Sequence, residues 1–242
     1  MYKNFTVSNV IISLCAMVFL AEFLGGYSVD GVALYYWESP SFSPYQLLSH
    51  QFVHGGVLHL LLNMMALWMF GRVLEGLWGS LRFLLFYVAC GIGAATIYQL
   101  VSYYQFHAAI EPLLAAGFSS HDLFQLFSNE RYYPQYPSSQ RAVEIFASPV
   151  VGASGAIYGI LAAFALRFPN HKLIFLLLPF PIAAKFFVPL LLCLDVYALA
   201  TGHSLLGVNI AHAAHLGGAL VGFILVLLIL RNKKRLGNKN SE

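Results

Sequence analysis

Four polar residues lie inside apolar stretches of the chain and could together perform a hydrolysis: Ser154, His215, His59 and Asn63. A serine hydroxyl is a weak nucleophile at neutral pH and needs an adjacent base, for which histidine is the usual choice. A reaction at a carbonyl also needs hydrogen-bond donors aimed at the developing oxyanion. The Asn63 amide, a His59 N–H and the Ser154 backbone N–H could supply these donors. The residue types therefore favour acyl transfer to a serine.

The spacing of these residues and of the small residues beside them supports their meeting. His59 and Asn63 are four residues apart, so they share one face of a helix. Small residues recur every four positions beside Ser154 and again beside His215. Such repeats let two helix backbones pack closely in a membrane. The two repeats are Gly155, Gly159, Ala163 and Ala214, Gly218, Gly222.

The composition indicates a polytopic membrane protein. Of the 242 residues, 59% are apolar and 10% are charged, against about 45–50% and about 25% in soluble domains. This excludes the soluble, disordered and coiled-coil classes, and a net charge of +3 does not favour a nucleic-acid partner. At roughly 20 residues for each span, we predict an all-α membrane protein with six spans. They are Val10–Tyr27, Gly56–Leu74, Phe83–Tyr104, Val150–Phe168, Ala183–Thr201 and Asn209–Leu230.

Basic residues set the orientation of these spans. With six spans both termini share a side, and only Arg131 and Arg141 of the 13 lysines and arginines fall on the other side. We therefore expect cytoplasmic termini. The second, fourth and sixth spans then run inward from the outer surface. The four polar residues would lie three to seven residues into these spans, in one layer roughly 5–10 Å deep.

The remaining segments complete one domain over residues 1–242. Pro179 and Pro181 disfavour a helix, so Leu173–Ile182 is expected to be a loop on the membrane surface. The polar segment at about 103–148 is predicted to be an extracytoplasmic insertion, with an amphipathic helix around His107–Gly117. The basic cytoplasmic tail at 231–242 would contact anionic lipids.

Three short motifs follow one another on alternate spans. They are His50-x3-His54-x4-His59-x3-Asn63, Gly152-Ala153-Ser154-Gly155 and Ala214-His215-x2-Gly218-x3-Gly222. Each motif alone is weak, but the three in this order are highly specific. They resemble the second-helix, nucleophile and base motifs of the rhomboid family of intramembrane serine proteases. The resemblance covers most of the chain and implies a six-transmembrane-helix, rhomboid-like bundle that needs no cofactor.

The resemblance also implies a role for each position. Ser154 would be the nucleophile and His215 its general base, a dyad without an acid. His59 and Asn63 would help to form the oxyanion hole, and Tyr158 would pack against the His215 ring. His212 would be only a neighbour of the base. The supporting residues would be Gly152, Gly155, Gly218 and Gly222 in the helices, with His50 and His54 holding the first outer segment.

Two motifs depart from the family pattern, and the role of one acidic residue, Asp195, remains undecided from the residues alone. Tyr45-Gln46 stands where the family often has Trp-Arg, and Glu75-Gly76-Leu77 stands where it often has Glu-x-Arg. These departures concern how the outer segment is held rather than the dyad. Asp195 in the fifth span has a depth that would allow a triad with His215, but the resemblance argues against a catalytic role for it.

The sequence thus predicts a serine endopeptidase that cleaves single-span or multi-span membrane protein substrates in or near their transmembrane segments. We expect it in the inner (plasma) membrane of a bacterium, surrounded by lipid. Three alternatives are weaker. A metal site could use the histidines, but no His-Glu-x-x-His helix is present. A client-binding protein without catalysis would not need the intact motifs. A transporter would place its polar site at the midplane.

Overall fold

The computed structural model describes residues 6–175, 178–203 and 211–239, and these form mainly helices. Five helical segments are long and apolar enough to cross a membrane. They are α1 (Val7–Gly25), the continuous segment α3–η2–α4 (Val57–Ala66, Leu67–Gly71 and Arg72–Trp78), α5 (Ser80–Ala115), α9 (Ala184–Thr201) and α10 (His212–Lys239). The prediction of an all-α membrane protein is confirmed. The first two residues of the predicted sixth span, and residues 240–242 of the basic tail, lie outside the described residues.

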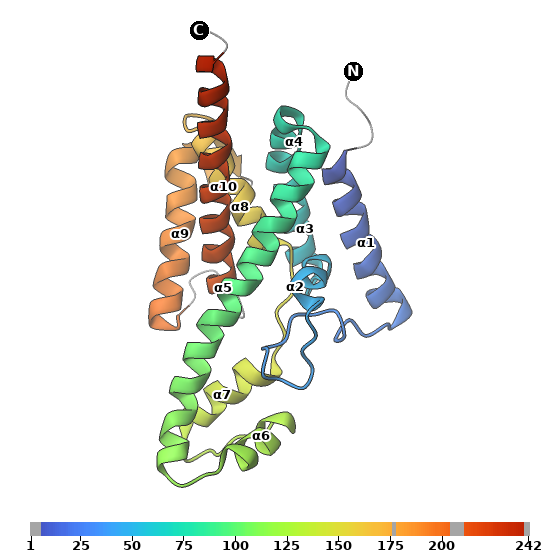
Figure 1. Cartoon of the computed structure of the whole chain (residues 1–242). Helices are drawn as coiled ribbons and strands as arrows, with labels where there is room; N and C mark the ends of the chain where they lie inside the picture. Colours follow the sequence, from blue (N-terminus) through green and yellow to red (C-terminus); the bar gives the residue numbers. More distant parts are fainter. Residues whose placement is uncertain (1–5, 176–177, 204–210, 240–242) are drawn as a thin grey trace.

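The sixth apolar helix, α8 (Ser154–Arg167), is shorter than a usual span and lies in the interior of the bundle. It has 14 residues, and α5, α9 and α10 surround it (Figure 1). Ala156, Ile160 and Ala163 on this helix are fully buried. A helix that other helices cover does not have to present a full apolar length to lipid. The shorter α8 can therefore lie within the membrane, because its neighbours shield it from the lipid.

The close contact between α8 and α10 depends on glycine. A Cβ atom on Gly218 would lie 1.8 Å from the carbonyl oxygen of Gly155, and one on Gly222 would lie 2.5 Å from the Cα of Gly159. Both distances are too short for any side chain. The two small-residue repeats therefore face each other, and this contact sets how closely the starts of α8 and α10 can approach.

The predicted outer insertion folds differently from the expectation. The segment around His107–Gly117 is not a separate amphipathic helix, because α5 continues without a break to Ala115. Two further helices follow, α6 (Ser120–Ser128) and α7 (Pro137–Ala147). They lie at the far end of α5 (Figure 1). Their apolar faces pack on the last turns of α5 and form a second, smaller core with Phe106, Leu113, Leu123, Phe127 and Phe146. This core explains why α5 outruns its predicted end.

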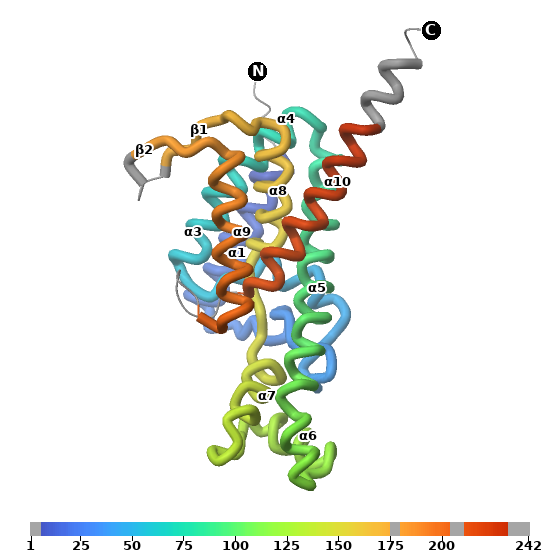
Figure 2. The backbone as a smooth tube through the Cα atoms, turned by 90° about the vertical axis from the view of Figure 1, so that its left-hand side faces the viewer, coloured from blue at the N-terminus to red at the C-terminus, as the bar shows by residue number. Residues whose placement is uncertain are grey.

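The prediction of an irregular loop at Leu173–Ile182 is wrong, because the segment forms strands. This segment contains two antiparallel strands, β1 (Lys172–Phe175) and β2 (Leu178–Ala183), with Lys172 opposite Ala183. The prolines exclude a helix as expected, but a proline is compatible with an edge strand, and in a two-stranded sheet both strands are edges. The strands lie at the end of the bundle opposite α6 and α7 (Figure 2).

Glu75 ties the start of α1 to the start of α5. Its carboxylate accepts hydrogen bonds from the backbone N–H of Val7 and of Ser8, at 2.6 and 2.9 Å. It also accepts from the hydroxyls of Ser8 and Ser80, each at 2.7 Å. A negative charge at a helix N-terminus is favourable because the unpaired N–H groups there carry partial positive charge. This buried carboxylate thus has a structural explanation even though the arginine of the family pattern is missing beside it.

Replacing Glu75 by alanine should destabilise the protein. The substitution leaves the N–H groups of Val7 and Ser8 without their acceptor, and a buried unpaired donor costs about 1–3 kcal/mol. Thermal unfolding in detergent micelles would measure the loss. Glu144→Ala is the matched control, because the contacts of Glu144 with Arg141 and Gln140 are exposed, and exposed pairs contribute little. Equal stability of the Glu75 variant and wild type would contradict this role.

Candidate active site

Ser154 and His215 lie within hydrogen-bonding distance of each other. The Ser154 Oγ is 2.9 Å from the His215 Nε2, across 61 residues of sequence. Ser154 is the first residue of α8, and His215 lies in the first turn of α10. The hydroxyl can donate to an unprotonated Nε2, which is the arrangement that a serine needs before it attacks a carbonyl.

The backbone before Ser154 requires glycine. Gly152 has a φ of +120°, and a Cβ on it would lie 2.7 Å from the His59 Nε2. The helix therefore begins at Ser154, four residues after the start of the predicted span at Val150, because the chain enters α8 through this glycine turn. The free N–H groups of the first helical turn then point toward the space around the Ser154 hydroxyl.

Tyr158 lies against the His215 ring. The two rings are stacked, with centroids 4.1 Å apart and planes 13° from parallel. Tyr158 follows Ser154 by one turn of α8, so the same helix carries the hydroxyl and the surface on which the imidazole rests. This stacking restricts rotation of the His215 ring and keeps its Nε2 toward Ser154.

His59 and Asn63 stand beside this pair on α3. The His59 Nδ1 accepts a hydrogen bond from the backbone N–H of Gly55 at 3.4 Å. That contact assigns the ring proton of a neutral His59 to Nε2, the nitrogen that borders Gly152. The Asn63 amide donates one of its hydrogens to the His59 carbonyl at 2.8 Å. The turn at Gly152 thus lies next to the His59 ring, and Asn63 follows His59 by one turn of α3.

His50 and His54 connect the outer segment to the turn before Ser154. The Gly152 N–H donates to the His50 carbonyl at 2.9 Å, and the His50 Nδ1 donates to the Gln46 carbonyl at 2.8 Å. The His54 ring is buried and meets the His59 ring edge-on, at 5.1 Å between centroids. Gln46, which stands in place of the family's arginine, also bonds to the carbonyls of Gly31 and Ser41. Hydrogen bonds of neutral groups therefore hold this segment.

The burial of these two outer histidines should make stability depend on pH. Burial lowers the pKa of His50 to about 4, partly offset by its bond to Gln46, and burial beside His59 lowers the pKa of His54 to about 4. An unfolded histidine titrates near 6.5. Between these pKa values, the two histidines are protonated in the unfolded chain but remain neutral in the folded protein. This stabilisation is complete above about pH 6.5 and is lost as the pH falls toward 4.

Lowering the pH from 7 to 5 should reduce the free energy of unfolding by about 2 kcal/mol for each of these histidines. Thermal or chaotrope unfolding in detergent at the two pH values would measure the loss. The His50→Gln variant should lose less than wild type over this interval, whereas His121→Gln, at an exposed site, should lose as much as wild type. An unfolding free energy of His50→Gln that falls as steeply as that of wild type would contradict the assignment.

Asp195 occupies a position that the sequence left open. Its Oδ1 lies 3.2 Å from the His215 Nδ1 and 2.5 Å from the His212 Nδ1. Asp195 is 3% exposed. The only advance signal was its predicted depth, which matched that of the dyad. His212, expected to be a mere neighbour, shares this carboxylate with His215.

Within the part of the chain that the structure describes, Asp195, His212 and His215 are also close enough together to bind a metal ion. One ligand atom from each of Asp195, His212 and His215 lies within 4.8 Å of the others. The two hydrogen bonds to Asp195 already account for that spacing. The other histidines considered from the sequence, His50, His54 and His59, do not belong to this group.

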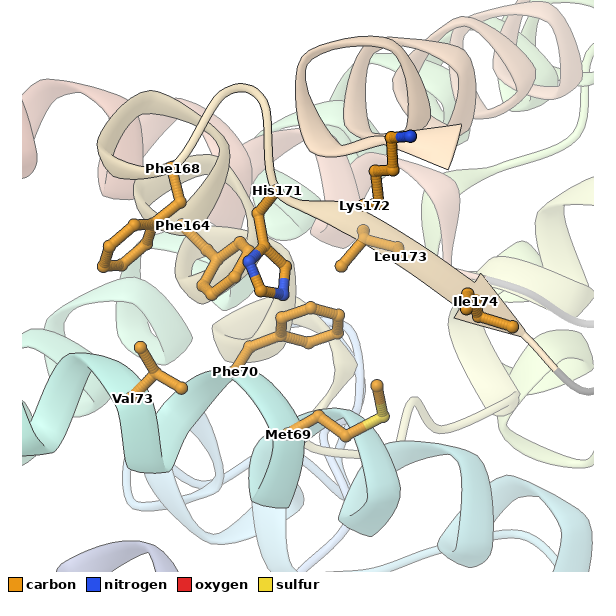
Figure 3. Close-up of a pocket in the computed structure, with 9 residues that line it drawn as sticks. All are labelled: Met69, Phe70, Val73, Phe164, Phe168, His171, Lys172, Leu173 and Ile174. Carbon is orange, nitrogen blue, oxygen red and sulfur yellow. The ribbon is translucent and has the colours of Figure 1, made fainter. Parts of the chain in front are cut away.

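A cavity of about 200 Å³ lies at the opposite end of α8 from Ser154. Phe164 and Phe168 at the end of α8, Phe70 of η2, and His171 and Leu173 at the start of the strand pair line it (Figure 3). Its walls are mainly apolar. The cavity is separate from the Ser154–His215 pair by most of the length of α8.

Fold and geometry together define an integral membrane protein with a partly buried serine–histidine pair where α8 and α10 meet. The family model of the Rhomboid domain matches residues 41–232, which include every candidate site residue. The chain belongs to the rhomboid family. The matched range leaves α1 outside it and includes α6 and α7.

Curated relatives agree with this family. The chain is 29% identical over 182 residues to "Rhomboid protein 1, mitochondrial" of Saccharomyces cerevisiae, an alignment that covers 75% of this chain and 41% of the relative. It is 31% identical over 172 residues to "Presenilin-associated rhomboid-like protein A, mitochondrial" of Danio rerio, covering 71% and 34%. It is 24% identical over 230 residues to "Rhomboid protease GlpG" of Haemophilus influenzae, covering 92% of each chain.

The coverage differs between these relatives. The chain spans less than half the length of the two mitochondrial relatives and nearly the whole of the bacterial one. Several matched relatives are named as mitochondrial, so the comparisons do not support the expected bacterial inner membrane over another membrane. Its place as an integral membrane protein rests on the five long apolar helices.

Proposed function

We propose that this protein is a serine-type intramembrane endopeptidase that hydrolyses peptide bonds in or near the transmembrane segments of membrane protein substrates. The observation that carries the proposal is the 2.9 Å contact between the Ser154 Oγ and the His215 Nε2. Its relation to a protein named as a rhomboid protease over 92% of both chains supports the same reading.

In the proposed reaction, the His215 Nε2 accepts the Ser154 proton while Oγ attacks the scissile carbonyl carbon. The resulting oxyanion is stabilised by donors that are already in place before the reaction. The first N–H groups of α8, the His59 Nε2–H and the Asn63 amide are the candidates. His215 then donates its proton to the leaving amine. A water molecule, activated by the same base, releases the acyl group from Ser154.

The proposed site lies within the membrane, at the start of α8 and not at the middle of this helix. We place both termini in the cytoplasm and the start of α8 toward the outer face, so substrates would be cut near their outer ends. A peptide bond inside an intact substrate helix is shielded by its own backbone, so residues that break the helix should favour cleavage. The chain would act as one rhomboid-like domain over 1–242, with the extracytoplasmic insertion at about 103–148, the basic tail at 231–242, and lipids around it.

A fluorophosphonate probe tests the proposed nucleophile directly. The reagent phosphonylates a serine that a neighbouring base activates, and peptide mass spectrometry locates the adduct. We expect labelling of Ser154 in the folded protein in detergent, and loss of labelling after heat unfolding. Labelling of other serines at an equal rate, or no labelling of Ser154, would argue for a client-binding protein without catalysis.

A further inference from the structure

A third side chain extends the contact between Ser154 and His215. Asp195, on α9, accepts from the His215 Nδ1 at 3.2 Å, while the His215 Nε2 is 2.9 Å from the Ser154 Oγ. Three separate helices, α8, α10 and α9, therefore contribute a hydroxyl, an imidazole and a carboxylate in one line. The side chains of His215 and Asp195 are only 11% and 4% exposed, so bulk water does not weaken this contact much.

A carboxylate in this position has a defined effect on an imidazole. It accepts the proton of Nδ1, so the lone pair of the neutral ring is left on Nε2, where the hydroxyl is. It also stabilises the imidazolium that forms when Nε2 takes the serine proton. Without such a partner, the ring can rotate or adopt the other tautomer. Tyr158 restricts rotation, but a ring stack does not choose between tautomers.

The cost of a buried carboxylate also calls for an explanation. An ionisable side chain in a membrane-spanning helix is expensive and is usually paired. Asp195 has two such partners, because the His212 Nδ1 lies 2.5 Å from the same Oδ1. His212 lies three residues before His215 in the same first turn of α10, and the two histidines share one oxygen of the carboxylate. If Asp195 served only to bind His212, its role would be structural. Experiments must therefore distinguish the effect of Asp195 on His212 from its effect on His215.

We infer that Asp195 is a positioning residue for His215 and forms with it and Ser154 a serine–histidine–aspartate triad. This inference rests on the proposed function. It differs from the dyad that the family resemblance implied. Asp195 touches no reacting atom and acts only through His215. The other titratable groups that face His215 are Tyr158 on α8, His212 on α10 and His59 on α3.

The central experiment measures hydrolysis of a reconstituted single-span substrate by wild type, Asp195→Asn and His212→Gln. We expect Asp195→Asn to lower kcat about 10- to 100-fold with KM little changed. The loss is smaller than the roughly 10⁴-fold effect in soluble triads, because Tyr158 still restrains the ring. His212→Gln should retain most of the activity, since His215 keeps its acceptor. A kcat of Asp195→Asn equal to that of wild type would overturn the inference, and so would an equal loss in His212→Gln.

A double-mutant cycle separates positioning from structural damage. On a His215→Ala background, Asp195→Asn should cause no further loss in the residual hydrolysis rate, because its target is gone. A loss that multiplies on both backgrounds would show general damage and would overturn the inference. An inactive wild type would instead contradict the proposed function, so the two failures are distinguishable.

A measurement on the unaltered protein does not depend on how Asp195 variants fold. Ring ¹⁵N spectra of wild type, with His215 assigned by comparison with His215→Ala, report which nitrogen carries the proton. We expect a proton on Nδ1 at neutral pH. A His215 ring with an unprotonated Nδ1 would overturn the inference even if every Asp195 variant unfolds.

Discussion

Replacing Ser154 by alanine should abolish hydrolysis of membrane protein substrates while leaving the fold intact. The substitution removes only the Oγ that lies 2.9 Å from the His215 Nε2. In a soluble serine protease the loss of the nucleophile costs about 10⁶-fold in kcat. An effect of this order leaves only the slow residual rate that binding and the oxyanion donors provide. Cleavage of a single-span substrate in proteoliposomes, followed by gel and mass spectrometry, would measure it.

The controls for this prediction use residues of the same kind. Ser148→Ala replaces an exposed serine at the end of α7 and should cleave at the wild-type rate. His215→Ala should lose nearly as much activity as Ser154→Ala, and the double variant should lose no more than either, because the two groups act as a unit. Cleavage that survives Ser154→Ala would remove the basis of the proposed mechanism.

Replacing Gly218 by valine should unfold or severely destabilise the protein. Even the Cβ of the new side chain would lie 1.8 Å from the Gly155 carbonyl oxygen, and that oxygen belongs to helix backbone that cannot move alone. Overpacking of a core costs about 1–3 kcal/mol and occasionally more; here the obstacle is backbone, so we expect about 3 kcal/mol or more. Thermal unfolding in detergent would measure the loss.

Gly76→Ala is the matched control for Gly218→Val. Gly76 lies in α4, and a Cβ there would meet nothing within 4 Å. Alanine is favoured over glycine in a helix by roughly 0.5–1 kcal/mol, so this variant should be as stable as wild type or more stable. Any Gly218→Val protein that does fold should be inactive, because separated helices hold Ser154 and His215 apart. A stable and active Gly218→Val protein would show that α8 and α10 do not pack as described.

The membrane class and the meeting of the serine with its base were predictable because they follow from local sequence. Apolar length determines which segments can cross a bilayer, and the four-residue spacing of glycines beside Ser154 and His215 determines which helix faces can approach. The same rules give the second-helix residues His59 and Asn63 their shared face. What these patterns do not supply is the identity of the membrane or of the substrate.

Local propensity failed where packing against a distant segment decided the outcome. The end of α5 was predicted near Tyr104, because polarity rises there, but α6 and α7 cover its last turns and the helix continues to Ala115. The prolines near 180 correctly excluded a helix, yet only pairing with Lys172 and Leu173 made the segment a strand. Leu77 replaces the arginine of a family motif whose glutamate, Glu75, is kept, and the role of Glu75 depends on the start of α1, 67 residues away.

The sequence by itself determined a membrane-spanning helical chain and predicted that one hydroxyl, two imidazoles and an amide share a layer, because hydropathy and helical spacing are properties of each segment alone. Only the tertiary structure decided that Asp195 joins them. Its depth was readable from the sequence, but its direction depends on how α9 rotates and packs against α10, and no repeat or spacing within α9 encodes that contact. The family resemblance implied a dyad without an acid, and the structure adds one buried carboxylate beside the His215 Nδ1.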